Sequence, residues 1–339
     1  MAKQESATVR ARVPASSANL GPGYDIFSIA LESPKLEVEF ASASSGSKKI
    51  TVKELDGGEH EVLPSQNSAG IALSALAAAQ GKPDGYTLRI SGKFPPAKGL
   101  GRSGAEAVGA IFCANSKFKL GLKGSRLVEM AGRAEPSNHL DNVSAAALGG
   151  FNIVTKTAIP ANQHITTLPP PRDLGVAILI PNVRKPSTAS ARQVIPMQIQ
   201  TAEHVQAASH VARISAAFAK GDVQGILESL PWDAIVESAR ANAGLYGTGV
   251  GSAYLLEEKK LLLEKFHVAE TISGAGPSRA LWYSISEDNA HKRKDRAGVI
   301  QPAIEFVTDR LKSLGHHVDD VFVTKPSSKG AVIISNPRR

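Results

Sequence analysis

The sequence predicts two α+β domains that meet near residue 168. Alternating strand patterns and helices of small residues come before this point, whereas long helical patterns and two closing strands come after it. Segment 157–172 is rich in Pro and Thr, shows little periodicity and is the predicted linker. Because 339 residues suffice for two domains of ordinary size, we place them at 1–168 and 169–339.

In the first domain, residues 9–13 alternate apolar and polar side chains as a half-buried strand does, and Pro14 is expected to end that strand. Residues 86–90 alternate in the same way and predict a second strand. Residues 103–112 are rich in alanine, with larger apolar residues at helical spacing, and predict a helix.

In the second domain, apolar residues from Ile304 to Leu314 recur at spacings of three, four and three, which predicts a helix. Gly315 stands where a C-cap belongs. Residues 321–323 and 332–334 are then predicted to be the closing strands.

The composition is that of a globular protein, with 42% hydrophobic and 21% charged residues, and argues against disorder, collagen-like repeats and disulfide scaffolds. The net charge of +8 favours anionic partners, namely nucleic acid, phosphorylated metabolites or a nucleotide. The single cysteine, Cys113, excludes an internal disulfide and a cysteine metal cluster. Since no long apolar stretch or signal-peptide pattern is present, we expect a soluble cytoplasmic protein that crosses no membrane.

Segment 14–25 follows the first strand directly and combines glycines with polar residues. Gly21 and Gly23 permit positive φ or close backbone approach. Asn19 and Asp25 bring an amide and a carboxylate into the same loop. The alternative is a tight connection in which these two side chains only bond to the backbone.

Segment 95–105 leads from a glycine-rich loop into a helix of small residues. The N–H groups of such a loop and the partial positive charge of a helix N-terminus attract an anion, and the flanking Lys98 and Arg102 favour a phosphate. It is not a Walker loop, because the Gly-Lys-Ser/Thr sequence is missing. Segment 272–278 joins two strand-like runs and predicts a turn that needs glycine geometry.

Together and in this order, the three segments resemble the motifs of the galactokinase, homoserine kinase, mevalonate kinase and phosphomevalonate kinase (GHMP) superfamily. Residues 14–25 match Pro-x-Ser/Thr-Ser-Ala-Asn-Leu-Gly-Pro-Gly-Phe/Tyr-Asp almost completely, and this pattern is specific for the homoserine kinase family. The second motif, Pro-x-x-x-Gly-Leu-Gly-Ser-Ser-Ala, is matched from the proline pair 95–96 to Gly101 and again at Ser103. The third, Ser-Gly-Ala-Gly-Pro-Thr/Ser, is matched by residues 273–278.

Further segments at 139–150, 188–196 and 235–240 are similar to family motifs, so that the resemblance extends from residue 8 to about residue 284. It implies an N-terminal α+β domain with a left-handed βαβ crossover and a ferredoxin-like C-terminal domain. The implied reaction is the ATP-dependent phosphorylation of L-homoserine to O-phospho-L-homoserine, a step in threonine biosynthesis. A homodimer is also implied.

The resemblance implies a pocket for the zwitterion homoserine. Asp25 would meet the ammonium, Arg192 and Arg240 would hold the carboxylate, and Asn19 and His139 would complete the pocket. Arginine suits this role because its planar fork binds carboxylates through two parallel hydrogen bonds. Surface salt bridges are the alternative role for the two arginines.

The resemblance also implies where ATP and magnesium bind. Asn67 would lie near the adenine, with a place at a helix N-terminus as its alternative. Ser103 and Glu135 would be the Mg²⁺ ligands, with Glu129 as a second candidate for the carboxylate. The implied catalytic residues are Asn19, Asn142 and Lys98, without a dedicated aspartate base. The implied ATP-binding residues are Asn67, Pro96, Lys98, Gly99, Leu100, Gly101, Arg102, Ser103, Gly104, Ala105 and Thr188.

Position 102 departs from the family, which usually has Ser where this chain has Arg102. A hydroxyl can ligate Mg²⁺, whereas a guanidinium has no lone pair to give and carries a positive charge. Three hypotheses follow. Arg102 contacts phosphate directly while Ser103 or Glu135 serves the metal, or its side chain points to solvent and changes little, or the kinase activity is lost.

Other functions stay open at this point. They are a family kinase with another small alcohol substrate, an inactive relative, and a basic RNA-associated protein supported by the net charge of +8. The presence of Asp25 beside Arg192 and Arg240 favours an α-amino acid over a mevalonate-type acid. Because aromatic residues are only 5% and no basic segment is interleaved with them, we expect no nucleic-acid partner.

Overall fold

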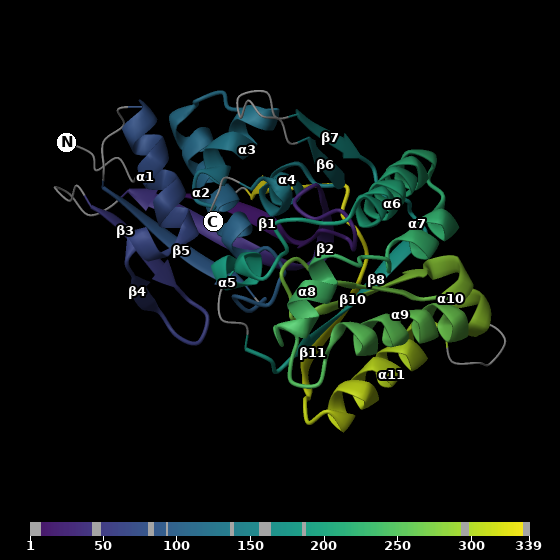
Figure 1. The fold of residues 1–339 in the computed structure, drawn as a ribbon. Coiled ribbons are helices and arrows are strands. Elements are labelled where there is room, and N and C mark those ends of the chain that lie inside the picture. The colour runs from purple at the N-terminus through teal and green to yellow at the C-terminus, as the bar shows by residue number, and fades with distance from the viewer. Residues whose placement is uncertain are drawn as a thin grey trace, which may run out of the picture.

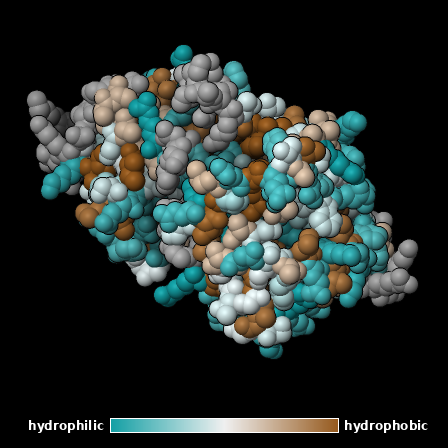
Figure 2. Space-filling model, in the orientation of Figure 1, coloured by the Kyte–Doolittle hydropathy of each residue, from teal (hydrophilic) through white to brown (hydrophobic). Residues whose placement is uncertain are grey.

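The computed structural model describes residues 8–42, 49–80, 85–92, 94–135, 139–155, 164–184, 188–292 and 298–334. Within these ranges, eight strands form one sheet and four strands form another, with helices packed on both (Figure 1). Hydrophilic residues are interspersed with hydrophobic ones over α9 and α11 (Figure 2), as expected for the surface of a folded domain. No helix among the described residues is both long and apolar enough to cross a membrane.

The larger sheet has the order β12-β1-β2-β5-β3-β4, with β6 beside β2 and β7 beside β6. Strands β3 and β5 are parallel and α1 lies between them in the chain, which makes the βαβ crossover of this sheet. The elements are β1 (Val9–Ala18), β2 (Phe27–Ser42), β3 (Ile50–Glu54), β4 (His60–Val62), η1 (Pro64–Gln66), α1 (Ser68–Gln80), β5 (Tyr86–Gly92), α2 (Arg102–Phe118), α3 (Gly124–Gly132), α4 (Asp141–Leu148), β6 (Phe151–Thr155), β7 (His164–Leu168) and β12 (Val332–Ile334).

Helix α2 covers strands β1 and β2 at close range. A Cβ at Gly109 would lie 2.4 Å from Cγ2 of Val38 in β2, so the glycine permits the close approach. The alternating pattern at 9–13 and the helix at 103–112 are confirmed, but Pro14 does not end β1. It stays paired with Lys35 at a shift of the β1–β2 register, where a residue without an N–H group is tolerated.

The smaller sheet is antiparallel with the order β11-β8-β10-β9, and helices lie between β8 and β9 and between β10 and β11 in the chain. This is the βαββαβ arrangement of a ferredoxin-like domain, as predicted. The elements are β8 (Leu174–Pro181), α5 (Thr188–Gln193), α6 (Thr201–Lys220), α7 (Val223–Ser229), α8 (Val236–Asn242), α9 (Ser252–Phe266), β9 (Ala269–Ile272), β10 (Arg279–Ser284), α10 (Ile285–Lys292), α11 (Ile300–Ser313) and β11 (Val318–Thr324).

Strand β8 is buried along its whole length because both of its faces are covered. Val176 and Ile178 pack in the core shared with the larger sheet, whereas Ala177 and Leu179 pack in a second core that includes residues of α9 and α11. Strand β8 therefore belongs to both cores, because one of its faces packs toward the larger sheet and the other toward α9 and α11.

Three further expectations have outcomes in the structure. The helix ending before Gly315 is confirmed as α11, and Gly315 has a φ of 81°. Both closing strands are present, but β12 pairs with β1 of the larger sheet. The predicted linker is wrong in part, because residues 164–168 form β7 beside β6, while residues 156–163 lie outside the described ranges. The boundary at residue 168 stays a prediction.

Candidate active site

A cavity of about 360 Å³ lies where the three glycine-bearing segments meet. Most of the residues predicted for a site line it: Asn19, Asp25, Asn67, Pro96, Gly99, Leu100, Gly101, Arg102, Ser103, Glu135, His139, Asn142, Arg192 and Arg240. Lys98, Gly104, Ala105 and Glu129 do not line it. Thr188 begins α5, but its side chain lies outside the described part of the structure.

The loop before α2 is held in place by close backbone contacts. Gly99 and Gly101 have φ values of 80° and 68°, which residues with a side chain rarely adopt. A Cβ at Gly99 would lie 2.1 Å from Ser273 O, and one at Gly101 would lie 2.1 Å from Ser16 Oγ. The loop therefore brings the N-terminus of α2, with its partial positive charge, to the cavity, where an anion would be stabilised.

One end of the cavity carries the Asp25 carboxylate and two guanidinium groups, those of Arg192 and Arg240. Asp25 accepts two hydrogen bonds from Arg192, at 2.9 and 2.7 Å, and Arg192 also donates to the Tyr24 hydroxyl at 2.7 Å. Arg240 donates to Ala191 O at 3.0 Å and its guanidinium lies 5.3 Å from the centre of the Tyr24 ring. Nε of Arg192 is buried without a hydrogen-bond partner among the described residues, so it has a donor to spare for a ligand.

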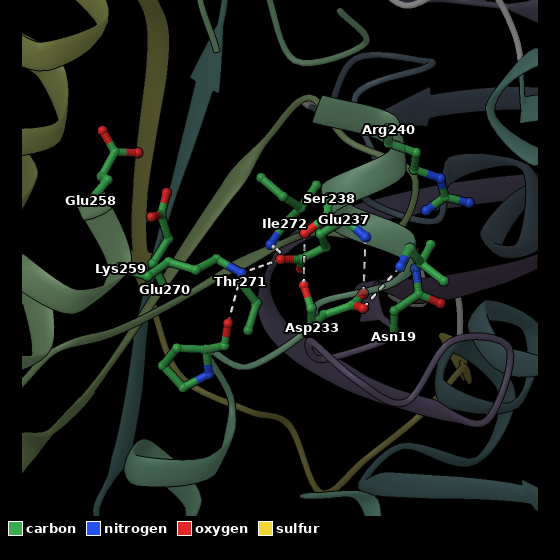
Figure 3. Close-up of polar contacts among 12 residues, drawn as sticks. Asn19, Asp233, Glu237, Ser238, Arg240, Glu258, Lys259, Glu270, Thr271 and Ile272 are labelled. Carbon is green, nitrogen blue, oxygen red and sulfur yellow. Dashed lines mark hydrogen bonds and ion pairs between the residues drawn. The ribbon is translucent and has the colours of Figure 1, made fainter. Parts of the chain in front are cut away.

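Asn19 connects two of the glycine-bearing segments. Its Nδ2 donates to Gly274 O at 2.7 Å, and its Oδ1 accepts from the backbone N–H of Asp25 at 3.1 Å. Arg240, on α8, donates to the same carbonyl at 3.3 Å. In Figure 3, Arg240 extends from α8 on the same side of the view as Asn19. The backbone contacts of the alternative role are thus present, and Asn19 also lines the cavity.

His139, two residues before the start of α4, lies between two buried carboxylates. Its Nδ1 is 3.1 Å from Asp141 Oδ1 and its Nε2 is 3.4 Å from Glu135 Oε2. Burial alone would lower the pKa of His139, but the hydrogen bond and charge of Asp141 outweigh it and the pKa is raised. The imidazolium form is therefore more stable here than in a free histidine side chain.

Glu135 and Ser103 form a pair of oxygen groups beside the first turn of α2. Burial raises the pKa of Glu135, while His139 and a hydrogen bond from Ser103 oppose the shift. Glu135 Oε1 is buried without a hydrogen-bond partner in the described structure. Among the residues that the structure describes, no cluster of three or more His, Cys, Asp or Glu could hold a metal. A divalent cation here would therefore need oxygens from a ligand, as Mg²⁺ commonly has.

The other end of the cavity is an acidic network around Arg102. Arg102 is 7% exposed and donates to Glu106 at 2.8 Å and to Asp56 at 3.0 Å. The hypothesis that Arg102 points to solvent is therefore wrong, because its guanidinium has nearby carboxylates to bind. Burial raises the pKa of Glu106 to about 7, although Arg102 opposes the shift.

Asn67 joins this network and also caps a helix. Its Oδ1 accepts from the N–H of Ala69 at 2.9 Å, at the start of α1. Its Nδ2 donates to Glu54 at 3.2 Å and to Glu106 at 3.1 Å. The alternative role at a helix N-terminus is thus present alongside its place in the cavity wall.

Two remaining predicted residues lie beside the glycine loop. Asn142 Oδ1 accepts from Ser16 Oγ at 2.8 Å, next to Gly101. The Lys98 ammonium donates to Pro181 O at 2.6 Å and to Val183 O at 3.2 Å. Lys98 therefore bonds to the end of β8, and the structure does not bring it into the cavity.

Several cavity residues were missed by the sequence reasoning. They include Tyr24, Glu54, Glu106 and Asp141. Glu106 stands four residues after Arg102, the spacing of an ion pair on a helix, and this signal could have found it. Glu54 comes from a distant strand, and no local pattern predicts its contact with Arg102.

Comparisons with known proteins found a family match, curated relatives and similar solved structures. The GHMP kinases N terminal domain family matches residues 67–150. The chain is 32% identical over 277 residues to a homoserine kinase of Methanococcus vannielii, which covers 80% of this chain and 86% of the relative. It is 31% identical over 329 residues to a homoserine kinase of Thermoplasma volcanium, covering 96% of both chains. The crystal structure of a homoserine kinase from Cytophaga hutchinsonii is similar with a TM-score of 0.80 at 24% identity, over 98% of this chain and 99% of that one.

Proposed function

The chain belongs to the homoserine kinase family of the GHMP kinases, and we propose that it transfers the γ-phosphoryl group of ATP to the hydroxyl of L-homoserine. The products are O-phospho-L-homoserine and ADP, and the reaction is a step of threonine biosynthesis. The observation that carries the proposal is the pairing of Asp25 with Arg192 beside Arg240 at one end of the cavity.

This charged end complements a free amino acid. Asp25 would accept the ammonium of homoserine, while Arg192 and Arg240 would donate to its carboxylate. A substrate that carries both charges can replace the Asp25–Arg192 contacts with its own, whereas a mevalonate-type acid offers no cation to Asp25. Asn19 and His139 complete the wall around the substrate.

The nucleotide would lie on the other side of the glycine loop. Its phosphates would meet the N–H groups of the loop and of the first turn of α2, from Gly99 to Gly104. Its adenosine would extend toward Asn67, at the end of the cavity away from Asp25. Asn142, beside Gly101, would be close to the transferring group.

Mg²⁺ is part of the proposal, since the Glu135 carboxylate and the Ser103 hydroxyl present oxygen ligands beside the phosphate position. A bound Mg²⁺ would supply charge neutralisation at the phosphate oxygens. Phosphoryl transfer requires mainly positioning and charge stabilisation, so the chain's residues need to align the homoserine hydroxyl with the γ-phosphorus. We also propose that the chain acts in the cytoplasm as a homodimer.

The test is ADP release by the purified protein with Mg²⁺ATP and, in parallel, homoserine, threonine, serine, mevalonate or no acceptor. Turnover that strongly prefers homoserine is expected. Turnover with another acceptor would keep the fold and overturn the substrate assignment. Absence of turnover with every acceptor would reject the proposed activity.

A further inference from the structure

The Arg102 guanidinium is surrounded by acceptors from the protein itself. Its Nε donates to Glu106 at 2.8 Å, and its Nη1 donates to Asp56 at 3.0 Å and to Phe94 O at 2.9 Å. Its Nη2 lies 3.6 Å from Glu54 Oε2. All three nitrogens are therefore directed at protein oxygens, although the side chain lines the cavity.

These acceptors come from separate parts of the larger sheet and its loops. Glu54 ends β3, Asp56 lies in the turn that follows, and Glu106 lies on α2. Asp56 also accepts from the N–H of Gly92, the last residue of β5, at 2.9 Å. Arg102 thus fastens the ends of two strands to the first turn of α2.

The same end of the cavity would carry an excess of negative charge without Arg102. Glu54 and Glu106 line the cavity, and Asp56 lies within hydrogen-bond distance of the same guanidinium. A nucleotide that enters here is itself an anion, and like charges in a partly desolvated site repel strongly. One guanidinium among three carboxylates lowers that repulsion.

We infer that Arg102 is a positioning residue for the nucleotide, which acts through Glu54, Asp56 and Glu106 by neutralising them and holding β3 and β5 against α2. The inference rests on the proposed function, since it takes the bound anion to be ATP. It follows that serine, the usual residue of the family at this position, weakens nucleotide binding in this chain.

The test is the variant R102S, measured by calorimetric titration with ADP and by steady-state kinetics. The dissociation constant of ADP and the KM for ATP are expected to rise about tenfold or more, since a buried charge loses its partner. The KM for homoserine should stay within about twofold, because the Asp25 end is untouched. The matched control is R213S, which removes an exposed arginine paired with Glu228 on the surface and should change none of these values.

A rescue experiment separates positioning from direct contact. In R102S/E54Q one of the three carboxylates is neutral, the glutamine amide oxygen can still accept from Asn67, and ADP binding should recover most of the loss. If the double variant stays as weak as R102S, Arg102 contacts the nucleotide itself and the inference is overturned. ADP binding by R102S equal to that of the wild type also overturns it.

The experiment remains decisive if R102S does not fold or if the wild type does not phosphorylate homoserine. If R102S does not fold, R102K carries the test, because lysine keeps the charge but lacks the fork that reaches three acceptors. A smaller rise in the ADP dissociation constant is then expected, and no rise rejects the inference. A wild-type protein that binds ADP but does not phosphorylate homoserine rejects the proposed function alone, since the ADP titrations need no acceptor.

Discussion

Two ion networks of this protein differ in what they face. The Arg102 network borders the cavity, and the side chains of Glu54 and Asp56 remain 24% and 37% exposed. A second network, of Glu237, Lys259, Glu270 and Arg279 (called here the sealed network), lies inside the ferredoxin-like domain, and each side chain is at most 3% exposed. Figure 3 shows Glu237, Lys259 and Glu270 of this network. One network can respond to a ligand, whereas the other contacts only protein.

The sealed network holds the helix that carries Arg240. Glu237 on α8 pairs with Lys259 on α9 and accepts from the N–H of Ile272, at the end of β9, at 2.8 Å. The Lys259 ammonium also donates to Pro231 O at 3.0 Å. Arg240 follows Glu237 by three residues on α8, so the network sets where Arg240 enters the cavity. Charges at the cavity should therefore control affinity, and the sealed charges should control stability.

The largest expected effect is on the sealed network. K259M leaves the Glu237 carboxylate buried without its cation, and the free energy of unfolding should fall by about 3–5 kcal/mol. The measurement is urea unfolding followed by circular dichroism. K260M changes the neighbouring exposed lysine and should cost less than about 0.5 kcal/mol. Equal losses in the two variants would show that the sealed pair has no special role.

Removal of a charge at the cavity should instead weaken substrate binding. D25N removes the anion that pairs with Arg192 and keeps a residue that tolerates the φ of 58° at this position. The KM for homoserine should rise about 10–100-fold, as expected for a lost hydrogen bond to a charged group, while the KM for ATP stays within about twofold. D309N, on the exposed face of α11, is the control. A rise in the KM for ATP instead would contradict the assignment of Asp25.

This difference between regions was only partly predictable from the sequence. The glycine motifs, the helix after them and the placement of Asp25, Arg192 and Arg240 in one pocket followed from local patterns and the family resemblance. The sealed network did not, because Glu237, Lys259 and Arg279 are far apart in the sequence and each alone is typical of a surface residue.

The glycine-rich loop was also only partly predictable from the sequence. Its motif predicted a phosphate site, and the structure places Gly99 and Gly101 at the cavity. The motif also included Lys98, whose ammonium instead bonds to carbonyls at the end of β8. Side-chain direction depended on the position of β8, about 80 residues later in the chain, and local sequence does not encode it.

Two glycine-to-alanine substitutions in loops test whether ATP binding depends on the close packing of the glycine-rich loop as well as on charge. G101A places a Cβ 2.1 Å from Ser16 Oγ at a φ of 68°, whereas G121A has a φ of 70° with open space around it. Both variants should lose about 1–2 kcal/mol of stability from the left-handed backbone. Only G101A should also raise the KM for ATP, by about tenfold, because it displaces the loop at the N-terminus of α2. If G121A raised the KM equally, the close packing of the loop would not be the cause.

The smallest effect concerns the pH dependence of stability that Glu106 brings to the Arg102 network. The pKa of Glu106 is raised to about 7 by burial, with repulsion from Glu54 and Glu135 adding to it and Arg102 opposing it. The native state then binds a proton that the unfolded chain releases near pH 4.5, so this stabilisation is complete below that pH and is lost as the pH rises through about 7. E106Q has no ionisable group at this position. When the pH is raised from 5 to 8, the free energy of unfolding of the variant should therefore rise by about 1 kcal/mol or more relative to that of the wild type. Urea unfolding at both pH values measures this gain, and E61Q on the exposed β4 should show none. A constant difference between E106Q and the wild type would mean that Arg102 already holds Glu106 ionised throughout this range.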